Sequence, residues 1–134
     1  MQDRPDAVEL LDAVRTFLEE QVVPVLEGMR QFHARVAVNV LAIVGREFEH
    51  GEKALLAEWH RLVELLGMNT AAPPPSGGAL RESVQEFNRV LVERIRAGAA
   101  DDGSWGTTVL AHLRAAAAER LAIANPGYVE PRVK

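Results

Sequence analysis

The feature that most constrains the fold of this chain is an apolar run in its first third, from Phe32 to Val44, which reads FHARVAVNVLAIV. Between Val36 and Val44 the only polar side chain is Asn39. A helix that is apolar on nearly every side is typical of the middle of a bundle, because it offers no face suited to water. The run therefore predicts a central helix in an all-α protein.

Three polar side chains of this central helix fall along one line. At 3.6 residues per turn, Arg35, Asn39 and Arg46 lie on one side of the helix, next to Phe32 and Val36. Polar groups in such a position need hydrogen-bonding partners. We therefore expect Arg35 and Asn39 to be at least partly buried and hydrogen-bonded inside the protein.

The line of Arg35, Asn39 and Arg46 has a functional and a structural interpretation. In the first, two guanidinium groups and an amide bind a carboxylate or phosphate of a ligand or of a partner protein. In the second, acidic residues of neighbouring helices pair with the arginines. The candidates for that pairing are Glu9, Glu19 and Glu119. Under either interpretation, a buried polar layer can also fix helix register or subunit pairing.

Apolar residues that recur every three or four positions predict about five helices, and no segment alternates as a strand does. The five segments are residues 3–24, 29–50, 52–66, 79–97 and 105–124, and Gly67 is expected to cap the third. The side chains expected to face inward from the last three segments are Leu55, Trp59, Leu62 and Leu66, then Leu80, Val84, Phe87, Leu91 and Ile95, then Leu110, Leu113, Ala117, Leu121 and Ala124. We expect Asp3 to cap the first helix, Pro24 to end or kink it, and Gly51 to stop the central helix. The chain length fits one domain, so residues 1–134 are predicted to form a single helical bundle.

One segment interrupts the helical pattern, MNTAAPPPSGG at residues 68–78. Three prolines followed by Ser-Gly-Gly cannot continue a helix, so we expect an irregular connection over Pro73–Gly78. A polyproline ligand for a recognition domain is the alternative interpretation. It is the weaker one, because no basic residues flank the prolines.

Composition excludes several classes of protein. The chain has no cysteine, which rules out a cysteine zinc site, a redox motif and a thiol nucleophile. A formal charge of −4 argues against a general binder of nucleic acid or of an anionic membrane. No apolar run approaches the roughly 18 residues of a membrane span, and MQDRPD does not resemble a signal peptide. We expect a cytoplasmic protein, and arginine at 13 of 15 basic positions indicates a bacterial one.

Motifs for catalysis or metal binding are missing from the sequence. The four histidines are never three or four residues apart, and Glu47–His50 is the one Glu-x-x-His step, whereas a di-iron bundle needs two. Phosphate-binding glycine loops and the Gly-x-Ser-x-Gly nucleophile motif are also missing. We therefore expect no catalytic residue, no cofactor and no metal.

Three stretches carry a family resemblance: RPDAVELLDAVRTFLEE, FHARVAVNVLAIVGREFE and LAIANPGY. They resemble an uncharacterised family of small bacterial helical proteins, known as a domain of unknown function. Members are typically encoded beside, or fused to, aminoglycoside-phosphotransferase-like kinases, in neighbourhoods with acyl-CoA dehydrogenases. The resemblance implies a supporting role, and it assigns no catalytic residue.

Two functions follow as hypotheses. The first is a non-catalytic accessory protein, a homodimer that docks on a phosphotransferase-like or acyl-CoA-metabolising partner. The second is a small-molecule binding protein that holds an acyl, CoA-like or phosphorylated metabolite between helices. The first requires an exposed apolar patch, and the second requires a concave pocket with convergent polar groups. The dimer is expected because several apolar residues lie off the main stripes. They are Leu10, Leu56, Val90, Val92 and Val109.

Overall fold

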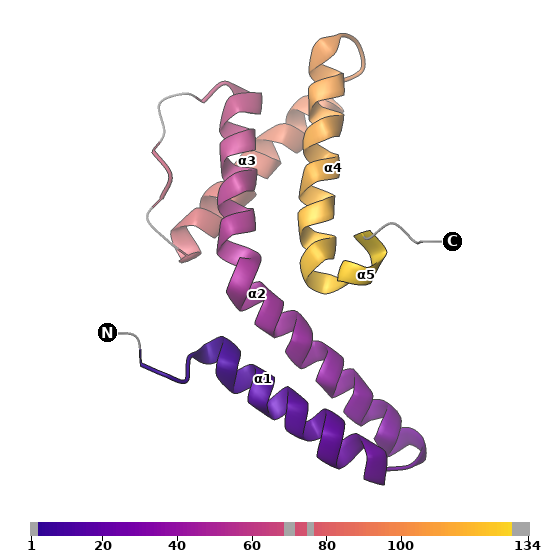
Figure 1. Cartoon of the computed structure of the whole chain (residues 1–134). Coiled ribbons are helices and arrows are strands. Elements are labelled where there is room, and N and C mark those ends of the chain that lie inside the picture. The colour runs from indigo at the N-terminus through magenta and orange to yellow at the C-terminus, as the bar shows by residue number, and fades with distance from the viewer. Residues whose placement is uncertain (1–2, 69–71, 75–76, 130–134) are drawn as a thin grey trace. The chain divides into compact units, whose positions relative to one another are not determined.

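The computed structural model describes residues 3–68, 72–74 and 77–129, and its regular structure is helical (Figure 1). The elements are α1 (Ala7–Phe17), the π-helical turn η1 (Leu18–Val22), the 3₁₀ turn η2 (Val23–Val25), α2 (Gly28–Leu66), α3 (Gly77–Arg96), α4 (Ser104–Ala124) and α5 (Pro126–Val129). Within those described ranges there is no strand. The predicted all-α fold of about five helices is confirmed.

The contacts within the chain define two compact units, which we describe separately. Unit 1 comprises Met1–Gly51 with Ile123–Asn125, and unit 2 comprises Glu52–Ala122 with Pro126–Lys134. Helix α2 contributes its first part to unit 1 and its last part to unit 2. The expectation that residues 1–134 form a single domain stays a prediction.

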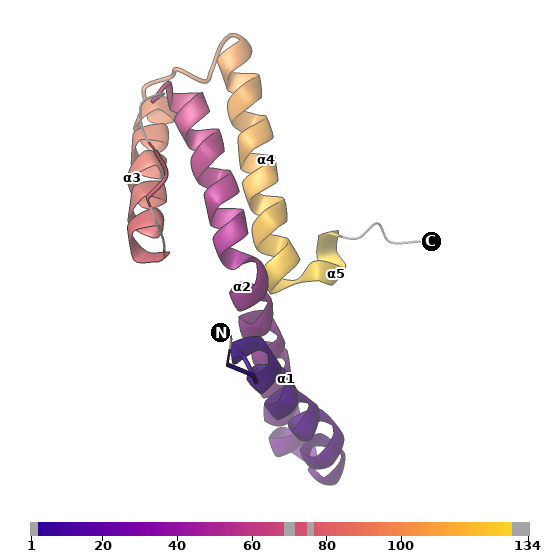
Figure 2. The same cartoon turned by 60° about the vertical axis from the view of Figure 1, so that its left-hand side comes forward.

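Unit 1 is a helical hairpin made of α1 and the first part of α2 (Figures 1 and 2). Helix α1 begins with a capping box, in which the Asp6 carboxylate accepts from the Glu9 amide and the Glu9 carboxylate accepts from the Asp6 amide, each at 2.9 Å. Asp6 therefore caps this helix, where the sequence had favoured Asp3. The reason is the reciprocal bond, which requires an acidic residue three positions after the cap.

Pro24 shapes the end of the first arm of the hairpin. Regular α-helix ends at Phe17, and the chain continues through the π turn into the 3₁₀ turn that contains Pro24. Proline cannot donate the amide proton that an α-helix would need at this point. Gln31 then closes the hairpin, because its side-chain amide donates to the Val23 carbonyl at 3.1 Å. Val23 is the only buried residue among the described residues of unit 1.

Unit 2 is a three-helix bundle formed by the last part of α2 with α3 and α4 (Figure 2). Trp59 and Leu62 are almost fully enclosed at its centre. The complete cluster of buried apolar side chains is Trp59, Leu62, Leu65, Leu66, Leu80, Val84, Leu91 and Val109. The inward stripes expected for 52–66 and 79–97 are confirmed, since all their members belong to this cluster or pack against it. Those members are Leu55, Trp59, Leu62, Leu66, Leu80, Val84, Phe87, Leu91 and Ile95.

Helix α4 turns a different face inward from the one the sequence indicated. Leu110 and Leu113 were expected in the core but are 48% and 45% exposed, whereas Val109, His112 and Ala116 are buried. Apolar residues occur on every side of this helix, so periodicity alone could not set its rotation. At its start the helix lies close to the preceding turn, since a Cβ on Gly106 would collide with the backbone of Ala100.

Gly51 does not end the central helix, which contradicts the expected division into two helices. Helix α2 runs without a break from Gly28 to Leu66. Glycine inside a helix costs only about 1 kcal/mol relative to alanine and, unlike proline, keeps its amide proton. Gly67, with φ of +72°, ends α2 as expected, and the following Met68 amide bonds back to the Val63 carbonyl.

The expected irregular connection is shorter than the sequence indicated. Pro73 and Pro74 are not helical, in agreement with the prediction. Residues 75–76 lie outside the described residues. Gly77 and Gly78 already belong to α3, since a glycine can begin a helix as readily as it can end one.

Candidate functional site

Arg35 and Asn39, two of the three site residues expected from the sequence, line a shallow groove of unit 1. The groove has a volume of about 390 Å³ and lies between the two arms of the hairpin. Its remaining lining residues are Arg15, Glu19, Val23, Val38 and Ala42. Both Arg35 and Asn39 are exposed, and the side chain of neither makes a hydrogen bond or ion pair with another described residue. The expectation that they are buried and internally bonded is therefore wrong for the described part of the chain.

Arg46, the third expected site residue, does not line this groove. It is half-buried, and its Nε donates to the carbonyl of Ile123 at 2.7 Å, a contact within unit 1. Ile123 belongs to the last turn of α4, where carbonyl groups lack helical partners and attract positive charge. The structure thus gives Arg46 a helix-capping contact and leaves Arg35 and Asn39 in the groove.

The acidic residues proposed as partners for these arginines pair elsewhere. Glu9 completes the capping box of α1. Glu19 accepts from Arg15 at 2.9 Å, and Arg15 also donates to Asp12. Glu119 pairs with Arg61 in unit 2. Charge within the groove is therefore divided between a neutralised Arg15–Glu19 pair and the unpaired guanidinium of Arg35.

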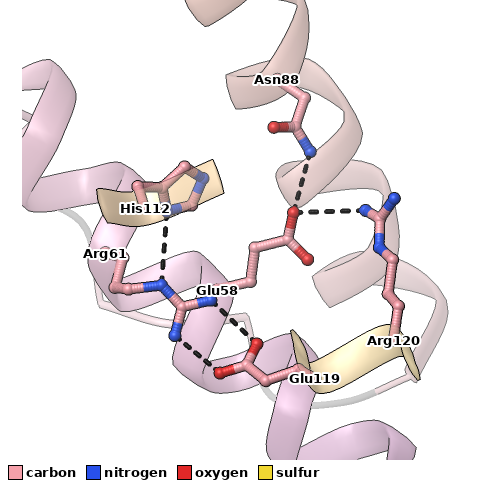
Figure 3. Close-up of polar contacts among 6 residues, drawn as sticks. All are labelled: Glu58, Arg61, Asn88, His112, Glu119 and Arg120. Carbon is pink, nitrogen blue, oxygen red and sulfur yellow. Dashed lines mark hydrogen bonds and ion pairs between the residues drawn. The ribbon is translucent and has the colours of Figure 1, made fainter. Parts of the chain in front are cut away.

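Unit 2 contains a cluster of polar side chains between its three helices, which the sequence did not reveal (Figure 3). Its centre is a two-pronged ion pair, in which the two terminal nitrogens of Arg61 donate to the two carboxylate oxygens of Glu119 at 2.7 and 2.8 Å. Both side chains are more than two-thirds buried. A paired geometry of this kind joins α2 to α4 in one fixed relation.

Glu58 joins all three helices of unit 2. It lies one turn before Arg61 on α2 and is 6% exposed. One carboxylate oxygen accepts from Asn88 of α3 at 3.2 Å and from the guanidinium of Arg120 on α4 at 3.4 Å (Figure 3). Both contacts are long, but a buried carboxylate requires partners of this kind, so they define which residues face one another.

His112 completes the polar cluster and is only 4% exposed. Arg61 Nε donates to its Nδ1 at 3.3 Å, so the ring proton lies on Nε2. That Nε2 has no hydrogen-bond partner among the described residues. Burial lowers the pKa of His112, and the neighbouring positive charge of Arg61 lowers it further. At neutral pH the ring is thus uncharged.

The chemistry available to this polar cluster is that of a structural layer. Each carboxylate is held by an arginine, and the histidine offers a proton rather than a lone pair. Across the ranges that the structure describes, no three His, Asp or Glu side chains form a group that could hold a metal ion. One sequence signal pointed here: Glu58 and Arg61 are polar residues one turn apart, next to the apolar stripe of 52–66.

The last candidate site is the apolar surface of unit 1, which consists of ten large side chains that remain exposed. They are Leu10, Val14, Phe17, Val25, Met29, Phe32, Val36, Val40, Val44 and Phe48. Five of them, from Phe32 to Phe48, recur at steps of four along α2. Monomeric proteins rarely expose apolar side chains in such density without a partner.

The structure is that of a small all-α protein. Unit 2 contains a polar cluster of paired charges, and unit 1 is a hairpin with exposed apolar side chains. The chain belongs to the family described as a domain of unknown function, DUF6285, whose match covers residues 24–128. No curated protein matches the chain, and no solved structure matches it either. Among the described helices, none combines the length and apolar character needed to cross a membrane.

Proposed function

We propose that this protein is a non-catalytic accessory protein that works by binding other protein chains. It self-associates as a homodimer and docks on a phosphotransferase-like or acyl-CoA-metabolising enzyme in the cytoplasm of a bacterium. The partner class comes from the family resemblance of the sequence, which is an association rather than a chemical argument.

The observation that supports this proposal is the apolar surface of unit 1. Phe17, Met29 and Phe48 are each more than half exposed, although side chains of this size gain most from burial. The polar cluster of unit 2 supports the proposal in a second way. Its carboxylates are held by Arg61 and Arg120, so neither is free to act as a general base.

The test combines binding with turnover. A tagged chain is used to capture proteins from a lysate of its native host, and the captured enzyme is then purified and titrated against the chain by calorimetry. The same preparation is incubated with ATP and with acyl-CoA thioesters. We expect saturable binding of a phosphotransferase-like or acyl-CoA-metabolising enzyme and no turnover by the chain alone.

The control is a chain in which Arg35 and Arg46 are both replaced by Ala. Turnover of ATP or acyl-CoA by the native chain above the rate of this variant would overturn the proposal. Failure of any such enzyme to bind, with a correctly folded chain, would overturn it as well.

The groove of unit 1 supports a second candidate function, a small-molecule binding protein. Arg35 and Asn39 face a space of about 390 Å³, at the lower end of the volumes of ligand pockets. An anionic acyl, CoA-like or phosphorylated metabolite would place its charge on Arg35, because Arg15 is already paired with Glu19 and Asp12. Calorimetry with acyl-CoA would detect this, and Arg35→Ala should abolish the binding while Arg89→Ala should not.

A further inference from the structure

We propose that the apolar surface of unit 1 is covered by the same surface of a second copy of this chain, so that two hairpins form a four-helix assembly. In this assembly α1 of each copy packs against α2 of the other. This assembly rests on the proposed function, the binding of other protein chains, and identifies one of those chains as a second copy.

Apolar side chains lie on more than one side of α2 within unit 1. One row is half-buried, has the three-and-four spacing of a helix pair and includes Ala34, Val38 and Leu41. A second row, Phe32, Val36, Val40, Val44 and Phe48, remains exposed, and because each step of four turns about 40° past a full helical turn, it winds around α2. A helix with apolar side chains on several sides is typical of a bundle of three or more helices. Unit 1 supplies only two helices.

The exposed apolar area of unit 1 is large for so short a hairpin. Its ten exposed apolar side chains are 36–76% exposed, and an interface of standard size takes roughly 800 Å² from each partner. A hairpin whose only buried described residue is Val23 has little core of its own. Contact with a second hairpin would supply that core.

The charges of the two arms favour a second copy as the occupant. Between residues 7 and 22 the first arm carries four acidic side chains and a single basic one, Arg15. Between residues 28 and 51 the second arm carries three arginines and two acidic side chains, Glu47 and Glu49, which lie at its end. Two acidic first arms therefore repel, whereas a first arm attracts the arginines in the second arm of another copy. This complementarity favours the order in which α1 of one copy meets α2 of the other.

The first experiment measures mass by analytical ultracentrifugation at micromolar concentration. We expect the native chain to sediment at twice its mass of 14.7 kDa. Val40→Glu, in the exposed row of α2, should weaken association at least about 100-fold, because it would bury an unpaired carboxylate. Val92→Glu is the matched control, a valine of similar exposure on α3 of unit 2, and it should leave the mass unchanged.

The second experiment tests the helix order and does not depend on how Val40→Glu folds. One variant carries Asp12→Lys and Glu20→Lys, and the other carries Arg30→Glu and Arg35→Glu; all four positions are exposed. At low salt each variant alone should associate about tenfold more weakly than the native chain, because its two arms now carry the same sign of charge. An equimolar mixture should regain the native affinity and not exceed it, since each arm meets an opposite charge in the native assembly and in the mixture alike. If α1 met α1 instead, the native chain would pair like charges, and the mixture would associate more tightly than the native chain.

The outcomes separate this inference from the proposed function. A native chain that sediments as a monomer, or a mixture that fails to regain affinity, overturns the self-association through α1 and α2. A monomer that still binds the captured enzyme overturns the homodimer and leaves the docking on an enzyme intact. A dimer that binds no enzyme supports this inference and overturns the docking on an enzyme.

Discussion

Unit 2 buries eight apolar side chains in one cluster, whereas unit 1 buries Val23 alone among its described residues. Each unit contains a helix with apolar side chains on more than one side, so the difference arises from the number of helices that meet. Three helices enclose a central space that Trp59 and Leu62 fill. Two helices share only a seam, and each keeps a second side exposed. A helical sequence pattern is thus sufficient to form the helices of both units. The stability of each unit depends on how many apolar helix faces pack against another helix.

The charged side chains of the two units differ in the same way. In unit 1, Arg15 pairs with Asp12 and Glu19, which lie three and four residues away on the same arm. In unit 2, Arg61 pairs with Glu119 across 58 positions of sequence. Local pairs of the first kind stabilise a helix slightly and contribute little to tertiary structure. Distant pairs of the second kind fix which helices are neighbours.

The comparison is tested most strongly by deleting a leucine side chain from each unit. Leu62→Ala should lower the free energy of unfolding of unit 2 by about 3–5 kcal/mol, because Leu62 is fully enclosed and its loss leaves a cavity. Leu10→Ala, at a leucine that is 53% exposed in the single chain, should change the free energy of unfolding of unit 1 by less than about 1 kcal/mol when the chain is diluted until it is monomeric. Urea denaturation measures both, and equal losses would contradict the difference between the units.

A smaller effect is expected from breaking the ion pair of unit 2. Arg61→Met should cost about 2 kcal/mol, because it leaves the Glu119 carboxylate and the His112 Nδ1 without a donor. The double variant Arg61→Met/Glu119→Met should recover at least half of this loss, since no charge is then left unpaired. Urea denaturation measures the free energy of unfolding of both variants. A double variant that is less stable than Arg61→Met would show that the two side chains act independently and not as a pair.

The buried histidine should make the free energy of unfolding of unit 2 depend on pH. This effect should be no larger than that of Arg61→Met. Because burial and Arg61 lower the pKa of His112 below its ordinary value of 6.5, the unfolded chain binds this proton more readily than the folded chain. The contribution of the uncharged His112 to stability is therefore fully present above its ordinary pKa, and it is lost as the pH falls through its lower pKa in the folded chain. The slope should not exceed about 1.4 kcal/mol per pH unit.

The measurement compares the free energy of unfolding of the native chain and of His112→Gln from about pH 7.5 to about pH 5. The variant lacks the titrating ring, so the difference between the two curves isolates it from the carboxylates. Parallel curves would show that His112 titrates alike in the folded and unfolded chain.

The smallest expected effect lies where α2 passes from unit 1 to unit 2. Gly51→Ala should stabilise the chain by about 0.5–1 kcal/mol, because glycine is poorly suited to the interior of a helix. The added Cβ would meet only the flexible carboxylate end of Glu47, which can move aside. Thermal unfolding measures the gain, and Gly67→Ala is the control. It should destabilise instead, since φ at that residue is +72°.

Sequence reasoning succeeded where one face of a helix differs clearly from the others. The stripe of Leu55, Trp59, Leu62 and Leu66 recurs at steps of three and four and carries the only tryptophan of its segment, so its period indicated the inward face. It failed on α4, where alanine and leucine surround the helix, so its own period did not indicate which face turns inward. The rotation of such a helix depends on packing against its neighbours, which leaves no periodic signal in the sequence.

The polar groups were less predictable than the apolar ones. Arg35 and Asn39 were placed together correctly, but the apolar residues around them face solvent in unit 1, so their expected burial did not follow. Arg61 and Glu119 were missed as a pair because they lie on different helices, and a charged residue gives no indication of which distant partner it meets. Pairing of this kind requires the rotation of α4, which the sequence left open.

Both tryptophans of the chain, Trp59 and Trp105, lie in unit 2, where their indole nitrogens donate to Ser83 Oγ and to the Leu65 carbonyl. The described part of unit 1 contains neither tryptophan nor tyrosine. Intrinsic fluorescence therefore follows one unit only, while far-ultraviolet circular dichroism sums the helices of both. Two denaturation curves recorded on one sample with these probes would coincide for a single cooperative transition. If the two curves separate, the part of the circular dichroism transition that fluorescence does not follow belongs to the hairpin of unit 1. Its stability can then be measured on the native protein without a label.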